Sequence, residues 1–301
     1  MTSSSNRKGL LLGFPEYSDP ARNLAAAAGL DYAEIDLHRF PDGESRLQLP
    51  DDLPERILIC RSLNQPNEKL VELALAASTA RDLGADNITL VAPYLCYMRQ
   101  DKAFHPGEAV SQSIVGSMIA NWFDGLITVD PHLHRVHRLK DAVPVSKAKS
   151  INATKAMAVY LDGRLDNPVL IGPDEESEQW VAAIAKRNHL EFHVARKLRF
   201  GDSDVQVTLP DADYRGRNIV LVDDVASTGR TLEATSRGLI PYQPASITVM
   251  VSHALFVDDA QERLRNAGVD EIWSCDSIIH PTNRISLAEC LAQAVAKLGL
   301  S

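Results

Sequence analysis

The stretch VLVDDVASTGRT, residues Val220–Thr231, joins an apolar run to two adjacent carboxylates and then to a hydroxyl-rich turn. The apolar run predicts a buried strand, and the residues after the turn follow the pattern of a helix. A strand that leads through a short turn into a helix is the repeating unit of a doubly wound parallel sheet. In such sheets ligands bind beyond the carboxyl ends of the strands, so we expect a binding site at this turn.

The turn itself has the composition of a site for a phosphorylated sugar. Gly229 permits a tight turn, and the N-terminus of the following helix supplies N–H groups and partial positive charge to a phosphate. Asp223 and Asp224, when ionised, are acceptors only, which suits the hydroxyl groups of a sugar or a metal ion. The simpler alternative is an ordinary helix N-terminus with two solvated aspartates. Further hydroxyl donors come from Ser227, Thr228 and Thr231.

Outward from this stretch, short apolar runs alternate with longer amphipathic segments along the whole chain. This alternation predicts an α/β protein with two tandem domains, each a mostly parallel sheet flanked by helices. LITVDPH in the first half echoes IVLVDDV in the second, and we expect domains at 1–148 and 149–301, with the segment 286–300 a candidate to pack back on the first domain. The expected strands are 10–14, 56–60, 87–92, 125–130, 168–172, 190–194, 218–223, 246–252 and 271–275.

Composition limits the class of function. The chain has 301 residues, enough for two domains, and its net charge of −9 argues against a nucleic-acid partner, which would need clustered Lys and Arg. No apolar stretch approaches the length of a membrane span, and the N-terminal apolar run is too short for a signal peptide. We therefore expect a cytoplasmic protein with no membrane partner. Its cysteines form no CxxC pair and are expected to be buried and reduced: Cys60, Cys96, Cys275 and Cys290.

The segment DPHLHRVH carries three closely spaced histidines, His132, His134 and His137. Positions two apart on an extended segment face the same way, so a zinc site of the kind used by metal-dependent hydrolases is one alternative. The His-x-His pair, His132 and His134, lies in the middle of the chain, and the later histidines are scattered. This pattern favours surface or packing roles for His134 and His137.

Six elements, in the same order along nearly the whole chain, resemble those of the ribose-phosphate diphosphokinase (PRPP synthetase) family. VLVDDVASTGRTL resembles the motif that binds phosphoribosyl diphosphate (PRPP) in type I phosphoribosyltransferase folds. The other five are RFPDGE, APYLCYMRQD, DPH, GPD and RKLR. The residues that match are Phe40, Asp42, Glu44, Pro93, Tyr94, Tyr97, Arg99, Gln100, Asp101, Asp130, His132, Pro173, Asp174, Lys197 and Arg199.

The resemblance implies two type I phosphoribosyltransferase-like domains and a role for each matched element. Lys197 and Arg199 would be catalytic, and residues His132 and Asp174 would bind Mg²⁺, the expected cofactor. The loop at Phe40 would reach ATP across a subunit interface, which implies a homodimer or a higher homo-oligomer. The implied ATP-binding residues are Phe40, Asp42, Glu44, Arg99, Gln100, Asp101 and His132. The implied ribose 5-phosphate-binding residues are Asp223, Asp224, Ser227, Thr228, Gly229, Arg230 and Thr231.

The implied reaction moves an intact diphosphoryl group from ATP to the 1-hydroxyl of ribose 5-phosphate, giving PRPP and AMP for nucleotide biosynthesis. Two alternatives stay open: a phosphoribosyltransferase that consumes PRPP, and a non-catalytic relative that regulates a partner enzyme. The three elements in the first half of the chain, RFPDGE, APYLCYMRQD and DPH, argue against the transferase. The presence of Lys197, Arg199, His132 and Asp224 argues against the regulator.

The sequence departs from the family pattern in two places. Glu175 and Glu176 stand where many relatives have glycines after the Pro-Asp turn. Two carboxylates do not cradle a diphosphate directly; we expect them to face away, to lie at the positive end of the following helix, or to engage a metal. Asp52 and Pro54 replace a Ser-x-Arg pair of the phosphate-activated bacterial type, so the chain resembles the archaeal type more closely.

Overall fold

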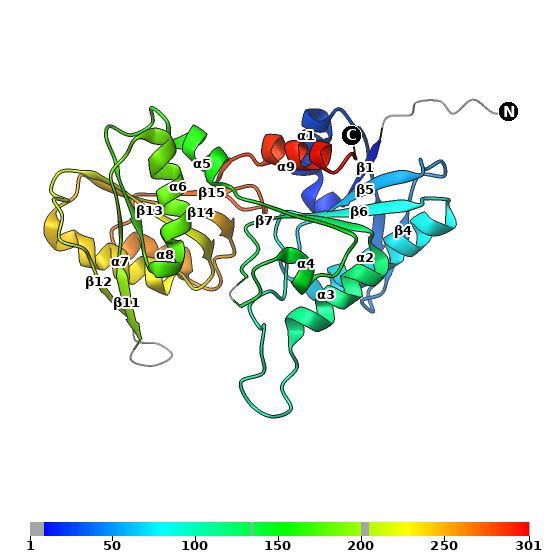
Figure 1. Cartoon of the computed structure of the whole chain (residues 1–301), viewed down its shortest axis with the longest axis horizontal. Coiled ribbons are helices and arrows are strands. Elements are labelled where there is room, and N and C mark those ends of the chain that lie inside the picture. The colour runs from blue at the N-terminus through cyan, green and yellow to red at the C-terminus, as the bar shows by residue number, and fades with distance from the viewer. Residues whose placement is uncertain (1–8, 134, 200–204, 301) are drawn as a thin grey trace. The chain divides into compact units, whose positions relative to one another are not determined.

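The computed structural model describes residues 9–133, 135–199 and 205–300 (Figure 1). Two compact units share the chain: the first contains the residues up to Ile151 together with those from Leu287 onward, and the second contains Asn152–Ser286. Each unit is built around its own six-stranded sheet, and every strand pair within these two sheets is parallel. The two-sheet α/β architecture predicted from the strand–helix alternation is confirmed.

The sheet of the first unit has the order β2-β1-β5-β6-β7-β8. Its central strands are almost entirely buried, because helices cover both faces of a parallel sheet; all five residues of β7 are buried. Helices α1 and α9 pack on one face, and α2, α3 and α4 lie on the other (Figure 1). The strands are β1 (Leu10–Gly13), β2 (Asp31–Glu34), β5 (Arg56–Cys60), β6 (Asn87–Ala92), β7 (Gly125–Val129) and β8 (Lys147–Ile151). The helices are η1 (Pro15–Tyr17), α1 (Ser18–Ala28), α2 (Pro66–Asp82), α3 (Ser111–Trp122), α4 (Leu139–Ala142) and α9 (Ala288–Lys297).

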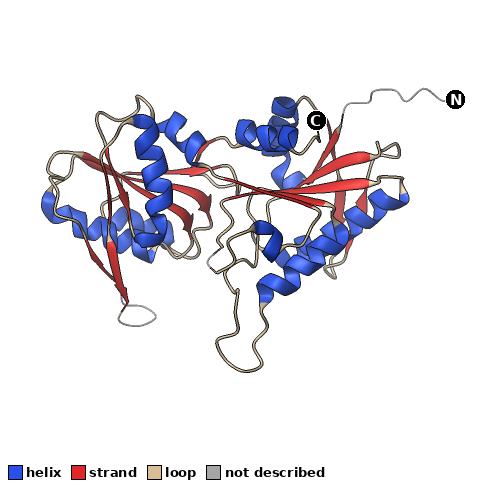
Figure 2. Cartoon of the chain, in the orientation of Figure 1, coloured by secondary structure: helices blue, strands red, loops and turns tan. Residues whose placement is uncertain are grey.

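The sheet of the second unit repeats this order as β10-β9-β13-β14-β15-β16. In both sheets the second strand lies on one side of the first, and the remaining strands follow on the other side. Figure 2 shows that both units combine strands with flanking helices. The strands are β9 (Val169–Gly172), β10 (Phe192–Val194), β13 (Asn218–Ala226), β14 (Ser246–Ala254), β15 (Glu271–Cys275) and β16 (Asn283–Ile285). The helices are α5 (Thr154–Leu161), η2 (Glu175–Ser177), α6 (Glu178–Asn188), α7 (Arg230–Leu239), η3 (Ile240–Tyr242) and α8 (Ala260–Asn266).

Each unit also carries an antiparallel hairpin directly after its second strand. The first unit has β3 (Asp36–Arg39) paired with β4 (Ser45–Gln48), and the second has β11 (Arg196–Arg199) paired with β12 (Val205–Thr208). Neither hairpin was predicted, because none of their four short strands, DLHR, SRLQ, RKLR and VQVT, contains an apolar run. The edge strands β2, β8 and β16 were missed for the same reason.

The segment after the second unit returns to the first. Helix α9 packs on α1, and the Lys147 Nζ on β8 donates a hydrogen bond of 3.2 Å to the carbonyl of Leu298. The four thiols are reduced, with three buried and that of Cys290 half-buried; burial raises the pKa of Cys96 to about 12. Within the described ranges, no helix is both long and apolar enough to cross a membrane.

One group of charged residues lies inside the first unit. Arg61, at the end of β5, is fully buried, and its guanidinium forms ion pairs with Glu16 and with Glu72, which is 1% exposed. Burial alone would raise the pKa of Glu72, but hydrogen bonds from Arg39, Arg61 and Ser45 outweigh it and lower the pKa to about 2. The carboxylate is therefore more acidic in the folded chain than in the unfolded one.

This shift predicts acid sensitivity with a definite sign. A depressed folded pKa adds stability that is complete above the ordinary value of 4.5 and is lost as the pH falls from there through about 2. We expect the unfolding free energy of the wild type to exceed that of Glu72→Gln. This difference should decrease by about 2 kcal/mol as the pH falls from about 5 to about 3. Urea denaturation at both pH values measures this, with the exposed Glu68→Gln as control. A difference that does not change with pH would contradict the prediction.

Candidate functional site

The turn at residues 227–229 lies where β13 ends and α7 begins. Gly229 has φ of +68° and is the last residue before the helix, a conformation that favours glycine. The backbone of the turn is held from outside: the carbonyl of Ser227 accepts the N–H of Val257 at 3.1 Å, and that of Thr228 accepts Nη2 of Arg263 at 2.6 Å. The positive end of α7 therefore lies at a rigid, hydroxyl-rich turn, as a phosphate site requires.

The two carboxylates predicted to face the sugar lie at the carboxyl end of β13. Asp224 is 3% exposed and Asp223 is half-buried, and the Asp224 N–H donates to Oδ1 of Asp223 at 2.9 Å. Burial, and after it the nearby charges of Asp224 and Asp174, raises the pKa of Asp223 well above its ordinary value. Three acidic residues from adjacent strands thus come together, an arrangement that a cation or hydroxyl donors would stabilise.

Asp174 lies at the end of β9, directly before the short helix η2. The hydroxyl of Ser177 donates to the carbonyl of Asp174 at 2.5 Å, and a side chain at Gly172 would come within 2.4 Å of that hydroxyl oxygen. The turn is therefore tight and needs glycine. Glu175 and Glu176 are exposed in η2, at the N-terminal side of α6, where a helix favours negative charge.

β9 and β13 are the neighbours between which the strand order of the second sheet reverses. Ligands of open α/β sheets bind at such a reversal, beyond the carboxyl ends of the strands. Asp174, the acidic pair and the turn all lie there, so the predicted ribose 5-phosphate residues lie together at this end of the second sheet.

Lys197 and Arg199 lie on β11, opposite Val207 and Val205 of β12. Their side chains, and residues 200–204, lie outside the described part of the structure. The base of this hairpin is placed by its backbone: the N–H of Ala195 donates to the carbonyl of Gly172 at 2.8 Å, next to Pro173 and Asp174. β12 also contacts α7. The hairpin therefore starts beside the acidic cluster.

In the first unit, the predicted ATP residues lie on three loops. Phe40, Asp42 and Glu44 form the tip of the β3–β4 hairpin and are exposed, with Phe40 42% exposed. The backbone of the tip is ordered by a hydrogen bond of 2.8 Å from the Phe40 N–H to the Glu44 carbonyl and by Gly43 at φ of +93°. The tip presents an aromatic ring and two carboxylates outside the sheet.

The second and third loops are tied to each other. Asp101 follows the exposed Arg99, and its carboxylate, 1% exposed, binds Nη1 of Arg135 at 2.6 Å and the Arg135 N–H at 3.1 Å. Burial alone would raise the pKa of Asp101, but these bonds lower it. Gln100 accepts the hydroxyl of Ser111 at 3.1 Å. Asp101 therefore fixes the segment that carries the half-buried His132.

The two predicted metal ligands belong to different units of the chain. His132 belongs to the first unit and Asp174 to the second. Among the described residues, no three His, Cys, Asp or Glu side chains form a metal site on their own, which includes His132 and His137 of the zinc alternative; His134 lies outside the description. Mg²⁺ is commonly held by one or two carboxylates together with substrate phosphates, which the acidic cluster of the second unit fits.

Several residues that shape the site were not predicted. Arg135 holds Asp101, Arg263 holds the turn through Thr228, and Ser177 closes the turn at Asp174. None of them is among the residues that match the family elements, and each acts on a partner through a contact that only the folded chain creates. The one available signal in the sequence was Arg135, which lies in the histidine-rich segment DPHLHRVH.

Comparison with known proteins decides the family. A family model described as the N-terminal domain of ribose phosphate pyrophosphokinase matches residues 11–122, and one described as a phosphoribosyl transferase domain matches residues 146–292. The ribose-phosphate pyrophosphokinase of Methanopyrus kandleri is 32% identical over 280 residues, covering 92% of this chain and 95% of that protein. The chain belongs to the ribose-phosphate pyrophosphokinase family. The resemblance stated from the sequence motifs is confirmed.

Other relatives agree with this assignment. Ribose-phosphate pyrophosphokinase 2 of Archaeoglobus fulgidus is 32% identical and covers 91% of this chain and 96% of its own length. Both are archaeal members of the ribose-phosphate pyrophosphokinase family, in line with the predicted archaeal type. The crystal structure of phosphoribosylpyrophosphate synthetase from Mycobacterium smegmatis has the same fold, with a TM-score of 0.80 at 19% identity over 97% of this chain and 99% of that one.

Proposed function

We propose that this enzyme transfers the β,γ-diphosphoryl group of ATP to the 1-hydroxyl of ribose 5-phosphate. The products are PRPP and AMP, the latter leaving as the bond between the α,β-bridging oxygen and the β-phosphorus breaks. The observation that carries the proposal is the full-length match to ribose-phosphate pyrophosphokinases together with the acidic cluster and phosphate-type turn at the strand reversal of the second sheet. A domain match alone would not separate this activity from transferases that share the turn.

The acceptor occupies the second unit in this proposal. Residues 227–231 hold the 5-phosphate at the N-terminus of α7, and Asp223 and Asp224 accept the ribose hydroxyls. The raised pKa of Asp223 supports the assignment, because a carboxylate crowded by Asp224 and Asp174 gains most from hydroxyl donors or a cation. Gly229 keeps the backbone close to the phosphate. The full set is Asp223, Asp224, Ser227, Thr228, Gly229, Arg230 and Thr231.

ATP is assigned to the three loops of the first unit. The exposed ring of Phe40 suits contact with a base, and Arg99 suits phosphate oxygens because its guanidinium is planar and always charged. Asp101 contributes by holding the His132 segment through Arg135. The hairpin tip is assigned to a neighbouring subunit's ATP, so the proposed working enzyme is at least a homodimer, and its proposed location is the cytoplasm. The full set is Phe40, Asp42, Glu44, Arg99, Gln100, Asp101 and His132.

The chemistry needs positive charge more than a dedicated base. Negative charge builds on the non-bridging oxygens as the 1-hydroxyl attacks the β-phosphorus, and Lys197 and Arg199 stabilise that charge. His132 and Asp174 are the residues that would hold Mg²⁺ together with substrate phosphates, and the ion would supply further positive charge. The 1-hydroxyl releases its proton to solvent water as its oxygen bonds to phosphorus.

An assay tests the proposal directly. The purified chain is incubated with ribose 5-phosphate, Mg²⁺ and ATP labelled at the β-phosphorus, and nucleotides and sugar phosphates are separated. We expect AMP and labelled PRPP in equal amounts, both dependent on ribose 5-phosphate and abolished by EDTA. Formation of ADP would indicate transfer of a single phosphoryl group. Absence of AMP formation would leave a non-catalytic role, and use of PRPP with a nucleobase would indicate a phosphoribosyltransferase.

A further inference from the structure

The two units are alike enough for their sites to be compared position by position. In the first sheet Gly13, the last residue of β1, lies opposite Cys60 of β5. In the second, Ile171 lies opposite Leu221, so that Gly172 falls opposite Val222. The next residue along the strand is Arg61 in the first unit and Asp223 in the second. A guanidinium therefore stands where the second unit has its sugar-binding carboxylate.

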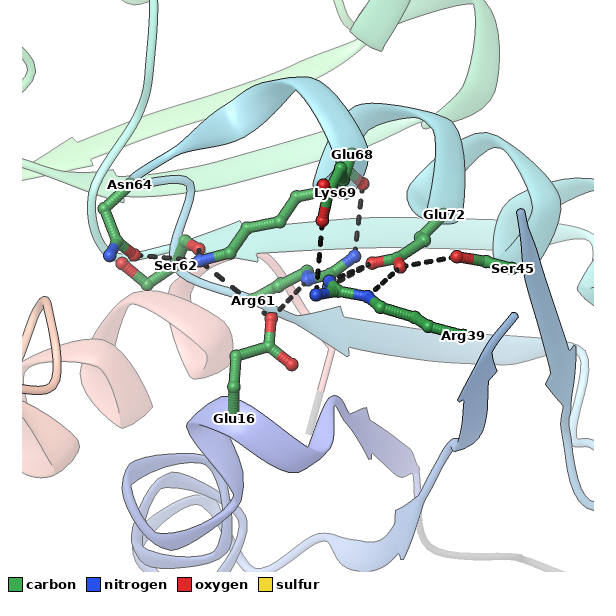
Figure 3. Close-up of polar contacts among 9 residues, drawn as sticks. All are labelled: Glu16, Arg39, Ser45, Arg61, Ser62, Asn64, Glu68, Lys69 and Glu72. Carbon is green, nitrogen blue, oxygen red and sulfur yellow. Dashed lines mark hydrogen bonds and ion pairs between the residues drawn. The ribbon is translucent and has the colours of Figure 1, made fainter. Parts of the chain in front are cut away.

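The place equivalent to the sugar site is filled in the first unit by the chain's own cations (Figure 3). The Arg61 guanidinium lies over the ring of Phe14, 3.7 Å from its centroid, and donates to Glu16 at 2.7 Å. The Lys69 ammonium lies in the turn before α2 and donates to the Ser62 carbonyl at 2.7 Å and to Asn64 Oδ1 at 2.9 Å. This site is closed to a sugar phosphate.

The hairpins are equivalent as well. Ile35 donates its N–H to the Gly13 carbonyl at 2.9 Å, as Ala195 does to Gly172 at 2.8 Å. Counting four residues onward from each, Arg39 of β3 takes the position that Arg199 takes in β11. In the first unit the hairpin carries residues 40–44 at its tip. In the second unit the hairpin strand β11 carries Lys197 and Arg199. The orientation of each hairpin therefore determines where residues assigned to the reaction lie.

Glu72 of α2 connects the closed site to the hairpin of the first unit. Arg39 and Ser45 form the last cross-strand pair before the tip. Arg39 Nε donates to Glu72 Oε1 at 2.9 Å and Nη2 to Oε2 at 3.3 Å, and the Ser45 hydroxyl donates to Oε1 at 2.8 Å. Arg61 binds the same carboxylate from the interior. Figure 3 shows these groups converging on Glu72 from the hairpin and from the end of β5.

We propose that Glu72 is a positioning residue that orients the nucleotide-binding hairpin tip through Arg39 and Ser45. This inference rests on the proposed function, which assigns residues 40–44 to ATP. Arg61 is shared between Glu72 and Glu16 in the interior, and the two outward contacts join Glu72 to the hairpin. They hold both arms of the hairpin at the point where the tip begins, while Leu37 and Leu47 pack its base on the core.

The test removes the outward contacts and leaves the buried pair intact. Truncating Glu72 itself would leave the buried Arg61 guanidinium with Glu16 as the remaining carboxylate of this pair and endanger folding, so the test variant is Arg39→Ala with Ser45→Ala. We expect the KM for ATP to rise about tenfold while the KM for ribose 5-phosphate stays at the wild-type value. Amide exchange within residues 40–44 is expected to accelerate. Ser45→Thr, which keeps the hydroxyl, is expected to retain the wild-type KM for ATP.

Two comparisons make the result decisive. Arg46→Ala removes a neighbouring arginine of the same hairpin, whose exposed pair with Asp36 at 3.3 Å does not involve Glu72, and it should change neither readout. Phe40→Ala reports whether the tip contacts ATP. A double variant with the wild-type KM for ATP and unchanged exchange, beside an impaired Phe40→Ala, overturns the positioning role. An unimpaired Phe40→Ala instead overturns the tip's assignment in the proposed function, and this inference with it.

Discussion

Replacing Lys197 or Arg199 with alanine is expected to lower kcat by about a hundredfold or more, with a much smaller change in the KM for ribose 5-phosphate. Both residues are assigned to the charge that develops on the phosphoryl oxygens, which is larger in the transition state than in bound ATP. Their hairpin begins at the Ala195–Gly172 hydrogen bond, beside the Asp174 turn. A loss confined to kcat is the signature of an interaction made mainly in the transition state.

The control for this experiment lies on the same strand. Arg196 is exposed at the start of β11 and has no assigned role, so Arg196→Ala removes an equal charge from the same hairpin. Initial rates of AMP and PRPP formation under saturating substrates compare the variants. Arg199→Lys should recover part of the loss, since an ammonium retains the charge but not the planar fork. Wild-type turnover in both alanine variants would remove these residues from the mechanism.

Replacing Asp223 with alanine is expected to lower kcat/KM for ribose 5-phosphate by one to two orders of magnitude, about the value of hydrogen bonds to a charged group. The KM for ATP should change little. The free chain should be at least as stable as the wild type, because the variant removes a carboxylate that burial and the charges of Asp224 and Asp174 already disfavour. Lower activity without lower stability distinguishes a binding group from a structural one.

Glu262→Ala, which removes an exposed carboxylate from α8 in the same unit, is the control for Asp223→Ala. Kinetics with varied ribose 5-phosphate and thermal melting give the two readouts. An unchanged KM and kcat for ribose 5-phosphate would sink the assignment of Asp223. A variant that melts well below the wild type would show that the carboxylate supports the fold instead.

Glu175 and Glu176, which stand where many relatives have glycines, are exposed in η2. Glu175 and Glu176 lie in the first turn before α6, where negative charge is favourable. Two of the expected arrangements, at the positive end of a helix and outward, agree with this placement. The tightness of the turn depends on Gly172 and Ser177 instead, which are buried and in contact range of each other.

The apolar strands and the order of the motifs were predictable because both are local properties. β5, β6, β7, β9, β13, β14 and β15 are buried on both faces and read as apolar runs, so their number and alternation with helices predict two parallel sheets. Gly229 and the acidic pair are adjacent in the chain, and the strand-to-helix turn brings them to one edge without help from distant residues. The family resemblance depends on such contiguous elements.

The hairpins and the residues that hold the loops depended on the tertiary structure. Glu72 and Arg39 are 33 positions apart, and Asp101 and Arg135 are 34 apart, so no local pattern pairs them. A buried charge is tolerated only where a partner meets it, and that partner is chosen by the packing of helices on the sheet. By itself, the sequence determined the two sheets, the family and the strand-to-helix turn at residues 227–229. The tertiary structure alone decided that Arg61 fills the place in the first unit that Asp223 takes in the second. Its partners Glu16 and Glu72 converge on it only when η1, β5 and α2 pack together.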